Sequence, residues 1–198
     1  MARTIAKDYD AKRQIILDRA AGLFADEGFD RASVSRIAQA CEISKANIYH
    51  YYSSKDDILF DILDNYLSGL RDRICGLPHE DLSPETRFQQ MVVEILLAYQ
   101  GADNEHRLQV GSLGFLPDAQ QDILRAYQRD LVRHAGDLIA DIAPQVFDGD
   151  KAKLRATTMS VFGMLNWFYM WNKAADSRAR ADYANLVCGL CLRGIPGL

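Results

Sequence analysis

The stretch that decides the fold is residues 33–52, which read SVSRIAQACEISKANIYHYY. It holds two short segments with apolar residues at helical spacing, each preceded by a serine suited to cap a helix, Ser33 and Ser44. The first predicted helix ends at about Cys41, and the second runs from Lys45 to about Tyr51. Two short helices joined by a tight turn are typical of a helix-turn-helix, whose second helix enters the major groove of DNA.

Helices this short are marginal in water by themselves, so their neighbours must hold them by packing. A helix predicted from about Ala11 to Glu27 precedes them, and Gly28 follows it as a C-terminal glycine should. A helix from Lys55 to about Cys75 follows, with Ser54 as its cap and acidic residues in its first turn. The pattern therefore predicts a compact three-helix head.

Apolar residues continue at helical spacing almost to the end of the chain, and no stretch favours a strand. Further helices are predicted over residues 84–100, 105–113, 117–142, 151–173 and 180–193. The sequence therefore predicts an all-α fold of about nine helices. We expect residues 1–54 to form a helix-turn-helix DNA-binding domain. Residues 55–198 should form a ligand-binding and dimerisation domain, with helix 55–75 as the connector.

The composition agrees with a folded protein: 48% of the 198 residues are hydrophobic and 25% are charged. The basic start has no apolar segment behind it and no run reaches the length of a membrane span, so a cytoplasmic location is expected. Residues 1–55 carry nine Lys or Arg against seven Asp or Glu, a net charge of +2. The remainder carries 14 against 20, a net charge of −6, so DNA contact should depend on local residues rather than on overall charge.

The second helix of the motif presents groups that suit DNA. Small or polar side chains at its start allow close approach to base edges, Lys45 can reach a phosphate or a guanine, and tyrosine hydroxyls donate to phosphates. Of Tyr51 and Tyr52, one is expected in the core and one at the surface. Arg3, Lys7 and Arg13 form either a DNA-contacting arm or a solvated terminus. The predicted DNA-binding residues are Ser33, Arg36, Ser44, Lys45, Ala46, Asn47, Tyr49, His50, Tyr51 and Lys55.

The runs GFDRASVSRIA (28–38), ISKANIYHYY (43–52) and SKDDIL (54–59) closely resemble the N-terminal signature of TetR (tetracycline-repressor-like) regulators. The resemblance covers about 50 residues with fixed spacing between its parts. It implies a homodimer that binds palindromic DNA, usually as a repressor that a small molecule releases. Three residues depart from the pattern: Glu42 replaces the usual turn Gly, Arg36 an acid, and Ala46 a common Gly. A positive φ at Glu42 would be mildly unfavourable.

The last two helices are predicted to form a four-helix dimer interface, because segment 159–171 is apolar all round its helix. The block FGMLNW (162–167) resembles a segment of TetR-type regulators of fatty-acid, steroid and aromatic-acid breakdown, several of which respond to acyl-CoA thioesters. The predicted dimer residues are Phe162, Leu165, Leu186, Val187 and Leu190. The predicted ligand residues are Met91, Tyr99, Phe115, Leu116, Met164, Trp167, Phe168 and Tyr169.

Other classes of function fit the sequence poorly. The four histidines lie in separate segments without the spacing of metal ligands, and no phosphate-binding loop occurs, so neither an enzyme nor a cofactor is expected. Cys188 and Cys191 form a C-x-x-C inside an apolar helix and are interpreted as buried structural thiols. A helical adaptor that binds only protein is the alternative, although it would not need an exposed Ser-Lys-x-x-x-Tyr-His-Tyr surface.

Overall fold

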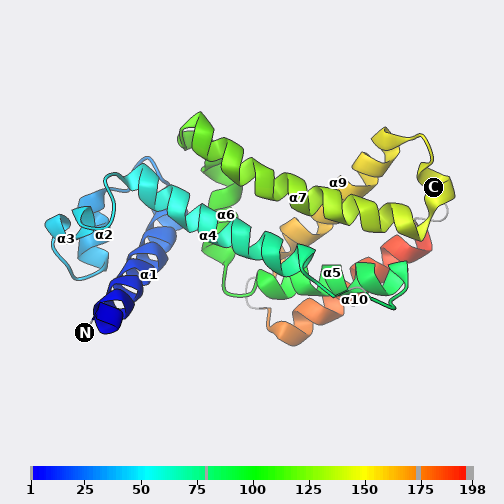
Figure 1. Cartoon of the computed structure of the whole chain (residues 1–198), viewed down its shortest axis with the longest axis horizontal. Helices are drawn as coiled ribbons and strands as arrows, with labels where there is room; N and C mark the ends of the chain where they lie inside the picture. Colours follow the sequence, from blue (N-terminus) through cyan, green and yellow to red (C-terminus); the bar gives the residue numbers. More distant parts are fainter. Residues whose placement is uncertain (1, 79, 173–174, 195–198) are drawn as a thin grey trace. The chain divides into compact units, whose positions relative to one another are not determined.

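The structure, a computed structural model, describes residues 2–78, 80–172 and 175–194, and for residues 2–7 the main chain only (Figure 1). Within these ranges it contains helices and no strand, so the predicted all-α fold is confirmed. No helix in these ranges is long and apolar enough to cross a membrane. The helices are α1 (Ala2–Glu27), α2 (Val34–Ala40), α3 (Lys45–Tyr49), α4 (Lys55–Cys75), α5 (Pro84–Ala98), α6 (Asp103–Gly111), the 3-10 turn η1 (Leu113–Phe115), α7 (Asp118–Ile142), α8 (Pro144–Phe147), α9 (Lys151–Trp171) and α10 (Ser177–Gly194).

Two features differ from the prediction. Helix α1 begins at Ala2 instead of Ala11, because the first ten residues contain no glycine or proline that would break it. The structure has ten α-helices in its described ranges instead of nine. The additional one is α8, a single turn with Pro144 at its start, where the fixed φ of proline fits the first helical position. The predicted end of α9 at Lys173 lies outside the described residues.

The chain divides into two compact units. Unit 1 comprises Met1–Leu67 and Asn104–Leu124, and unit 2 comprises Ser68–Asp103 and Arg125–Leu198. Helices α4 and α7 each contribute residues to both units. This division is a structural one, and the functional boundary at residue 54 stays a prediction.

The core of unit 1 holds the short helices in place. Helices α1 and α2 pack together, as do α2 and α3 (Figure 1). Apolar side chains from α1 to α4 are almost completely excluded from solvent in this core: Ile16, Ala20, Phe24, Ile37, Ile48, Ile58, Leu59 and Leu63. Their burial provides the stabilisation that short helices lack when isolated.

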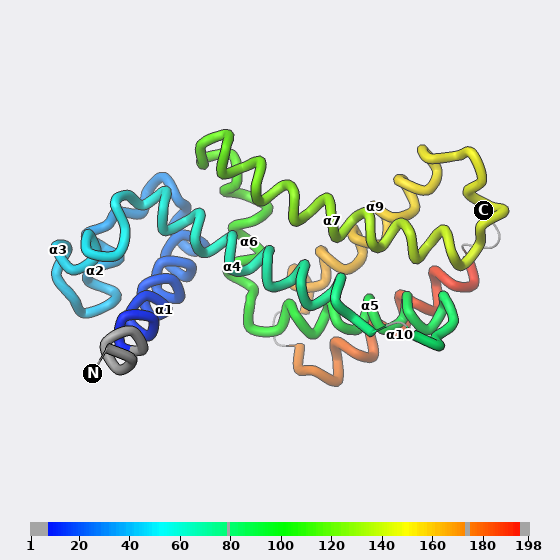
Figure 2. Tube along the Cα trace, viewed as in Figure 1, coloured from blue at the N-terminus to red at the C-terminus, as the bar shows by residue number. Residues whose placement is uncertain are grey.

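Unit 2 is built around the packing of α5 on α10, which lie side by side (Figure 2), with α9 against both. Arg180 is buried here, and carbonyl groups satisfy its guanidinium. Its Nε donates to the carbonyl of Ala175 at 3.2 Å, and Nη1 donates to that of Leu96 at 3.3 Å. The guanidinium also lies over the ring of Phe168. A buried arginine paired in this way ties the start of α10 to the end of α5.

The C-x-x-C pair lies on the buried side of α10. Both thiols are free, and Cys188 and Cys191 are 3% and 8% exposed. Burial, with a smaller contribution from the neighbouring Cys191, raises the pKa of Cys188 to about 12. Such thiols stay protonated and unreactive at neutral pH, so the interpretation as buried structural thiols is confirmed.

Candidate nucleic-acid interface

Three serines start three successive helices of unit 1, as the sequence predicts. The hydroxyl of Ser33 accepts a hydrogen bond from the backbone N–H of Arg36 at 3.3 Å. Ser44 accepts from Asn47 at 3.1 Å, and Ser54 accepts from Asp57 at 3.0 Å. Each cap satisfies one N–H group that the first turn of a helix leaves without a partner.

The turn between α2 and α3 depends on Glu42, whose φ is +56°. Its N–H donates to the carbonyl of Gln39 at 3.1 Å, and the N–H of Ile43 donates to that of Ala38 at 3.0 Å. These two hydrogen bonds define a Schellman motif, which normally places glycine at the left-handed position. The unusual backbone expected at Glu42 is therefore confirmed, and it sets the direction in which the chain enters α3.

Helix α3 has one buried side and one exposed side. Ile48 is fully buried, while Tyr49 on the other side is 50% exposed. The ammonium of Lys45 lies 5.7 Å from the centre of the Tyr49 ring. In the segment from Ser44 to His50, the exposed residues are Ser44, Lys45, Ala46, Asn47, Tyr49 and His50. This surface combines small residues, hydrogen-bonding groups and one cation, which is the chemistry that reads a DNA groove.

A partly buried polar cluster, which the sequence pattern did not reveal, holds the end of the motif. The Tyr52 hydroxyl donates to Asp61 Oδ2 at 2.5 Å, and Arg13 Nη2 donates to Asp61 Oδ1 at 2.5 Å. Burial, reinforced by the hydrogen bond with Asp61, raises the pKa of Tyr52. The cluster joins α1, the end of the α3 segment and α4, which are separated in sequence by up to 48 residues. No local spacing could have indicated it.

Lys55, one of the predicted DNA-binding residues, has partners inside the protein. Its ammonium donates to the carbonyls of Phe29, Asp30 and Ala32 at 2.7, 3.3 and 3.2 Å. It also lies 4.3 Å from the centre of the Phe29 ring. The three N–H donors of the ammonium are therefore used inside the protein. Lys55 fixes the loop before α2 in this structure, and its predicted contact with DNA stays a prediction.

The remaining predicted DNA residues lie at the edge of this surface. Arg36 is exposed but pairs with Glu27 at 2.6 Å. Tyr51 is half-buried and stacks on Tyr9 with 4.7 Å between ring centres, whereas Tyr52 is buried, so the expected division between the two tyrosines is confirmed. Arg13 is committed to Asp61, and the side chains of Arg3 and Lys7 lie outside the described residues.

The predicted ligand residues fall into both units. Phe115 and Leu116 belong to unit 1, and the other six belong to unit 2. In unit 2, Met91, Tyr99 and Phe168 are buried, and the Tyr99 hydroxyl donates to Asn166 Oδ1 at 2.8 Å. Met164 and Tyr169 are half-buried. Trp167 is 62% exposed, and its place in an apolar ligand pocket stays a prediction.

The predicted dimer residues are also divided. Leu186 and Leu190 are 57% and 58% exposed on α10. Phe162, Leu165 and Val187 are buried inside the protomer, so they are corrected to core residues. An apolar helix must bury one side in its own unit before the other can meet a partner, and apolarity alone did not show which side is which.

The fold and the exposed surface of α3 define a DNA-binding regulator with a helix-turn-helix. Comparison with known families agrees. The family described as "Bacterial regulatory proteins, tetR family" matches residues 16–62, and the "Tetracyclin repressor-like, C-terminal domain" matches residues 81–195. The chain therefore belongs to the TetR family of DNA-binding transcriptional regulators, and its relatives reported below are regulators rather than enzymes.

The chain is similar to a TetR-family transcriptional regulator from Bordetella parapertussis, with 34% identity, a TM-score of 0.86 and coverage of 94% of this chain and 96% of that one. It shares the fold of the regulator AibR, with 21% identity, a TM-score of 0.75 and coverage of 90% and 97%. It is 29% identical to the regulator YuxN of Bacillus subtilis over 65% of this chain and 45% of YuxN. The chain thus spans about half or less of the first curated relatives that it matches.

The strained turn yields a stability test. Replacing Glu42 by glycine removes the left-handed penalty of a side-chain-bearing residue, so we expect the free energy of unfolding to rise by roughly 0.5–1 kcal/mol. Gly28→Ala is the matched opposite case, because Gly28 has a φ of +89°. We expect the free energy of unfolding of this variant to fall by about 1 kcal/mol. Urea denaturation of both variants measures the two effects. An unchanged or lower midpoint for Glu42→Gly would contradict the role given to this turn.

Proposed function

We propose that the protein is a homodimeric repressor that binds a palindromic operator through α2 and α3 and is released by a small apolar or acyl-CoA-type effector. It would act in the cytoplasm, where bacterial promoters lie. The observation that carries the proposal is the exposed surface of α3, held in place by the fully buried Ile48. Ligand release of an operator requires that the effector bind the two states of the protein with different affinity.

We assign the start of α3 to the base edges and the residues after it, or beside it, to the phosphates. Ala46 and Ser44 are small, so the start of α3 can approach base edges closely. Asn47 offers an amide that can pair with adenine, and Lys45 offers a cation for guanine or phosphate. Tyr49 and His50, one turn on, suit phosphate contact, as do Ser33, Arg36 and Tyr51 at the edge of the surface.

The dimer proposal is supported by apolar side chains that unit 2 leaves exposed. On α9, Met159 and Trp167 are 47% and 62% exposed, and on α10 Leu186 and Leu190 follow each other at a spacing of four residues. Apolar surface concentrated on two helices is typical of an interface. A twofold dimer of this kind also matches a palindromic operator, since each half-site meets one recognition helix.

The effector proposal is supported by resemblance and by the character of unit 2. AibR, whose fold this chain shares, is described in complex with isovaleryl coenzyme A and operator DNA. The apolar part of an acyl chain suits the region of Met91, Met164 and Phe168, and the Tyr99–Asn166 pair provides polar groups among them. We infer an acyl-CoA thioester as the effector class.

The first test concerns DNA. Tyr49→Ala should weaken binding to a promoter fragment from the gene neighbourhood by about tenfold, because one contact in a DNA interface contributes roughly 1–3 kcal/mol. Its ring is half exposed, so the thermal midpoint should stay unchanged. Val110→Ala, an exposed apolar residue on α6, is the control and should bind normally. Band-shift titrations at two salt concentrations measure both, and equal affinity of the two variants would show that the recognition surface is misplaced.

The second test concerns assembly. Leu190→Asp introduces a charge into the proposed interface and should convert the dimer to a monomer in sedimentation velocity, because an unpaired charge is strongly unfavourable when buried. Operator affinity should fall with it, since the two half-sites are no longer bound together. Ile123→Asp, also at an exposed apolar position but on α7, should remain dimeric. A dimeric Leu190→Asp protein would exclude this surface as the interface.

The third test concerns the effector. A saturating acyl-CoA should raise the thermal midpoint, since a ligand at about 100 times its Kd adds roughly 2.7 kcal/mol of stability. The same ligand should release a labelled operator fragment. Free coenzyme A and the free acids serve as controls and should do neither. A flat response across short, long and aromatic acyl groups would remove the acyl-CoA proposal while leaving DNA binding intact.

A further inference from the structure

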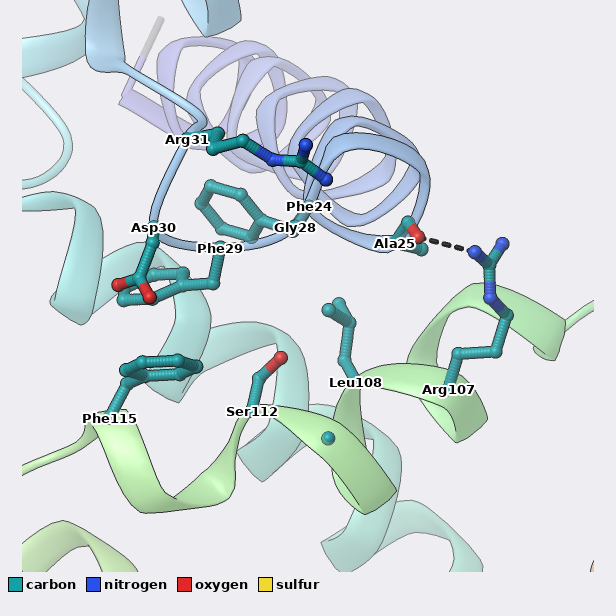
Figure 3. Close-up of a pocket in the computed structure, with 11 residues that line it drawn as sticks. Phe24, Ala25, Gly28, Phe29, Asp30, Arg31, Arg107, Leu108, Ser112 and Phe115 are labelled. Carbon is teal, nitrogen blue, oxygen red and sulfur yellow. Dashed lines mark hydrogen bonds between the residues drawn. The ribbon is translucent and has the colours of Figure 1, made fainter.

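Unit 1 contains a pocket of about 550 Å³ beside the C-terminal end of α1 (Figure 3). One wall is formed by the end of α1 and the loop that follows, from Phe24 to Arg31, and the other by residues of α6, the 3-10 turn and the Ser112 between them. The volume lies within the range of about 300–1,000 Å³ typical of small-molecule sites. Every lining residue belongs to unit 1.

The inner surface of the pocket is aromatic. The rings of Phe29 and Phe115 lie 5.2 Å apart between their centres, and Phe24 meets Phe29 edge-on at 5.1 Å. Phe24 and Phe29 are buried, but Phe115 is 46% exposed. Leu108 lies at the middle of the pocket in Figure 3. An exposed phenyl ring beside a buried one offers a stacking surface that a flat apolar molecule would cover with a gain in free energy.

The lining of the pocket includes two arginines, each bonded to the last turn of α1. Arg31 Nε donates to the carbonyl of Glu27 at 2.6 Å. Arg107 donates to the carbonyl of Ala25 and pairs with the exposed Asp26 at 3.1 Å. A guanidinium has five N–H donors, so both arginines, held in place by these bonds, keep donors for an anion.

Two further polar groups complete the lining. Asp30 lies at the end of the pocket away from Arg107, and Ser112 is 7% exposed with its hydroxyl directed into the pocket (Figure 3). The lining therefore holds two positive side chains, one negative side chain and an aromatic surface. A complementary ligand carries an anionic group at one end and a hydrogen-bond donor at the other.

We propose that this pocket binds small aromatic carboxylates with a hydroxyl, amino or N–H group opposite the carboxylate. The ring stacks on the exposed face of Phe115, which itself packs against the buried Phe29. The carboxylate accepts hydrogen bonds from Arg107 and Arg31, and the donor at the far end meets Asp30. The site is distinct from the residues of unit 2 proposed above for the acyl-CoA effector.

Binding here has a consequence that rests on the proposed function. The loop from Gly28 to Arg31 forms part of the pocket and leads directly to Ser33, the cap of α2. Lys55 holds the same loop through three carbonyls and the Phe29 ring. A ligand in contact with Phe29 therefore acts on the segment that positions the helix-turn-helix, and operator affinity changes when the pocket fills.

The experiment uses the full chain without DNA and three probes: 4-hydroxybenzoate, 4-hydroxyphenylacetate and indole-3-acetate. Saturation-transfer NMR and calorimetric titration measure binding. At least one acid should bind about tenfold more tightly than its neutral amide, because the amide loses the ion pair with the arginines. Absence of binding by all three acids, or equal binding of acid and amide, overturns the proposal.

Variants locate the site. Gly111 lines the pocket and a Cβ there meets nothing within 4 Å, so we expect the bulkier side chain of Gly111→Leu to obstruct the pocket and abolish binding. Gly69→Leu is the matched control, since Gly69 is also helical, exposed and free of neighbours. Arg107→Gln gives a second variant, in which the acid should lose its advantage over the amide. Binding that survives Gly111→Leu, or is lost equally in Gly69→Leu, overturns the assignment.

The operator is then titrated with and without the tightest probe. A change of at least about threefold in operator affinity, absent in Gly111→Leu, supports the coupling. Unchanged affinity despite measured ligand binding overturns the coupling alone. Failure of the protein without ligand to bind any operator fragment contradicts the proposed function and leaves the measured binding site standing.

Discussion

The recognition helix depends on the burial of one side chain. Helix α3 has only five residues, fewer than an isolated helix needs to be stable in water. Ile48 is its buried residue and is completely excluded from solvent against the core of unit 1. Because Ile48 supplies the packing of the helix, the exposed side chains of α3 are not needed for packing and suit the proposed contact with DNA. Tyr52 and Asp61 then hold the chain immediately after the helix.

Two atypical features, the backbone of Glu42 and the hydrogen bonds of Lys55, also help to position the motif. Glu42 adopts a left-handed backbone that disfavours its side chain, and the two hydrogen bonds of the Schellman motif offset part of that strain. The ammonium of Lys55 donates hydrogen bonds to three carbonyls of the loop before α2. Without it, these carbonyls would need water as their partner. Both residues act on the backbone that orients α2 and α3, so their contribution to recognition is indirect.

Unit 2 divides its apolar residues between two tasks. The second half of helix α9, residues 159–171, is apolar all round, and it packs Val161, Leu165 and Phe168 inward while leaving Met159 and Trp167 exposed. Helix α10 does the same with Val187 inward and Leu190 outward. An exposed apolar surface on two adjacent helices is unfavourable in water, so the hydrophobic effect that forms the core also supports the proposed association with a second copy.

The sequence alone determined the helical fold, the helix-turn-helix, its serine caps, the unusual turn at Glu42 and the family. These features follow from local periodicity, capping chemistry and fixed spacing, which neighbouring residues encode directly. Only the tertiary structure decided which apolar residues of α9 and α10 lie inside, that Lys55 binds the carbonyls of the loop before α2, and that Arg13, Tyr52 and Asp61 meet. It also decided that Phe29 and Phe115 share a pocket with Arg107. Those outcomes join residues far apart in the chain, and no local pattern records which distant side chain will provide a partner.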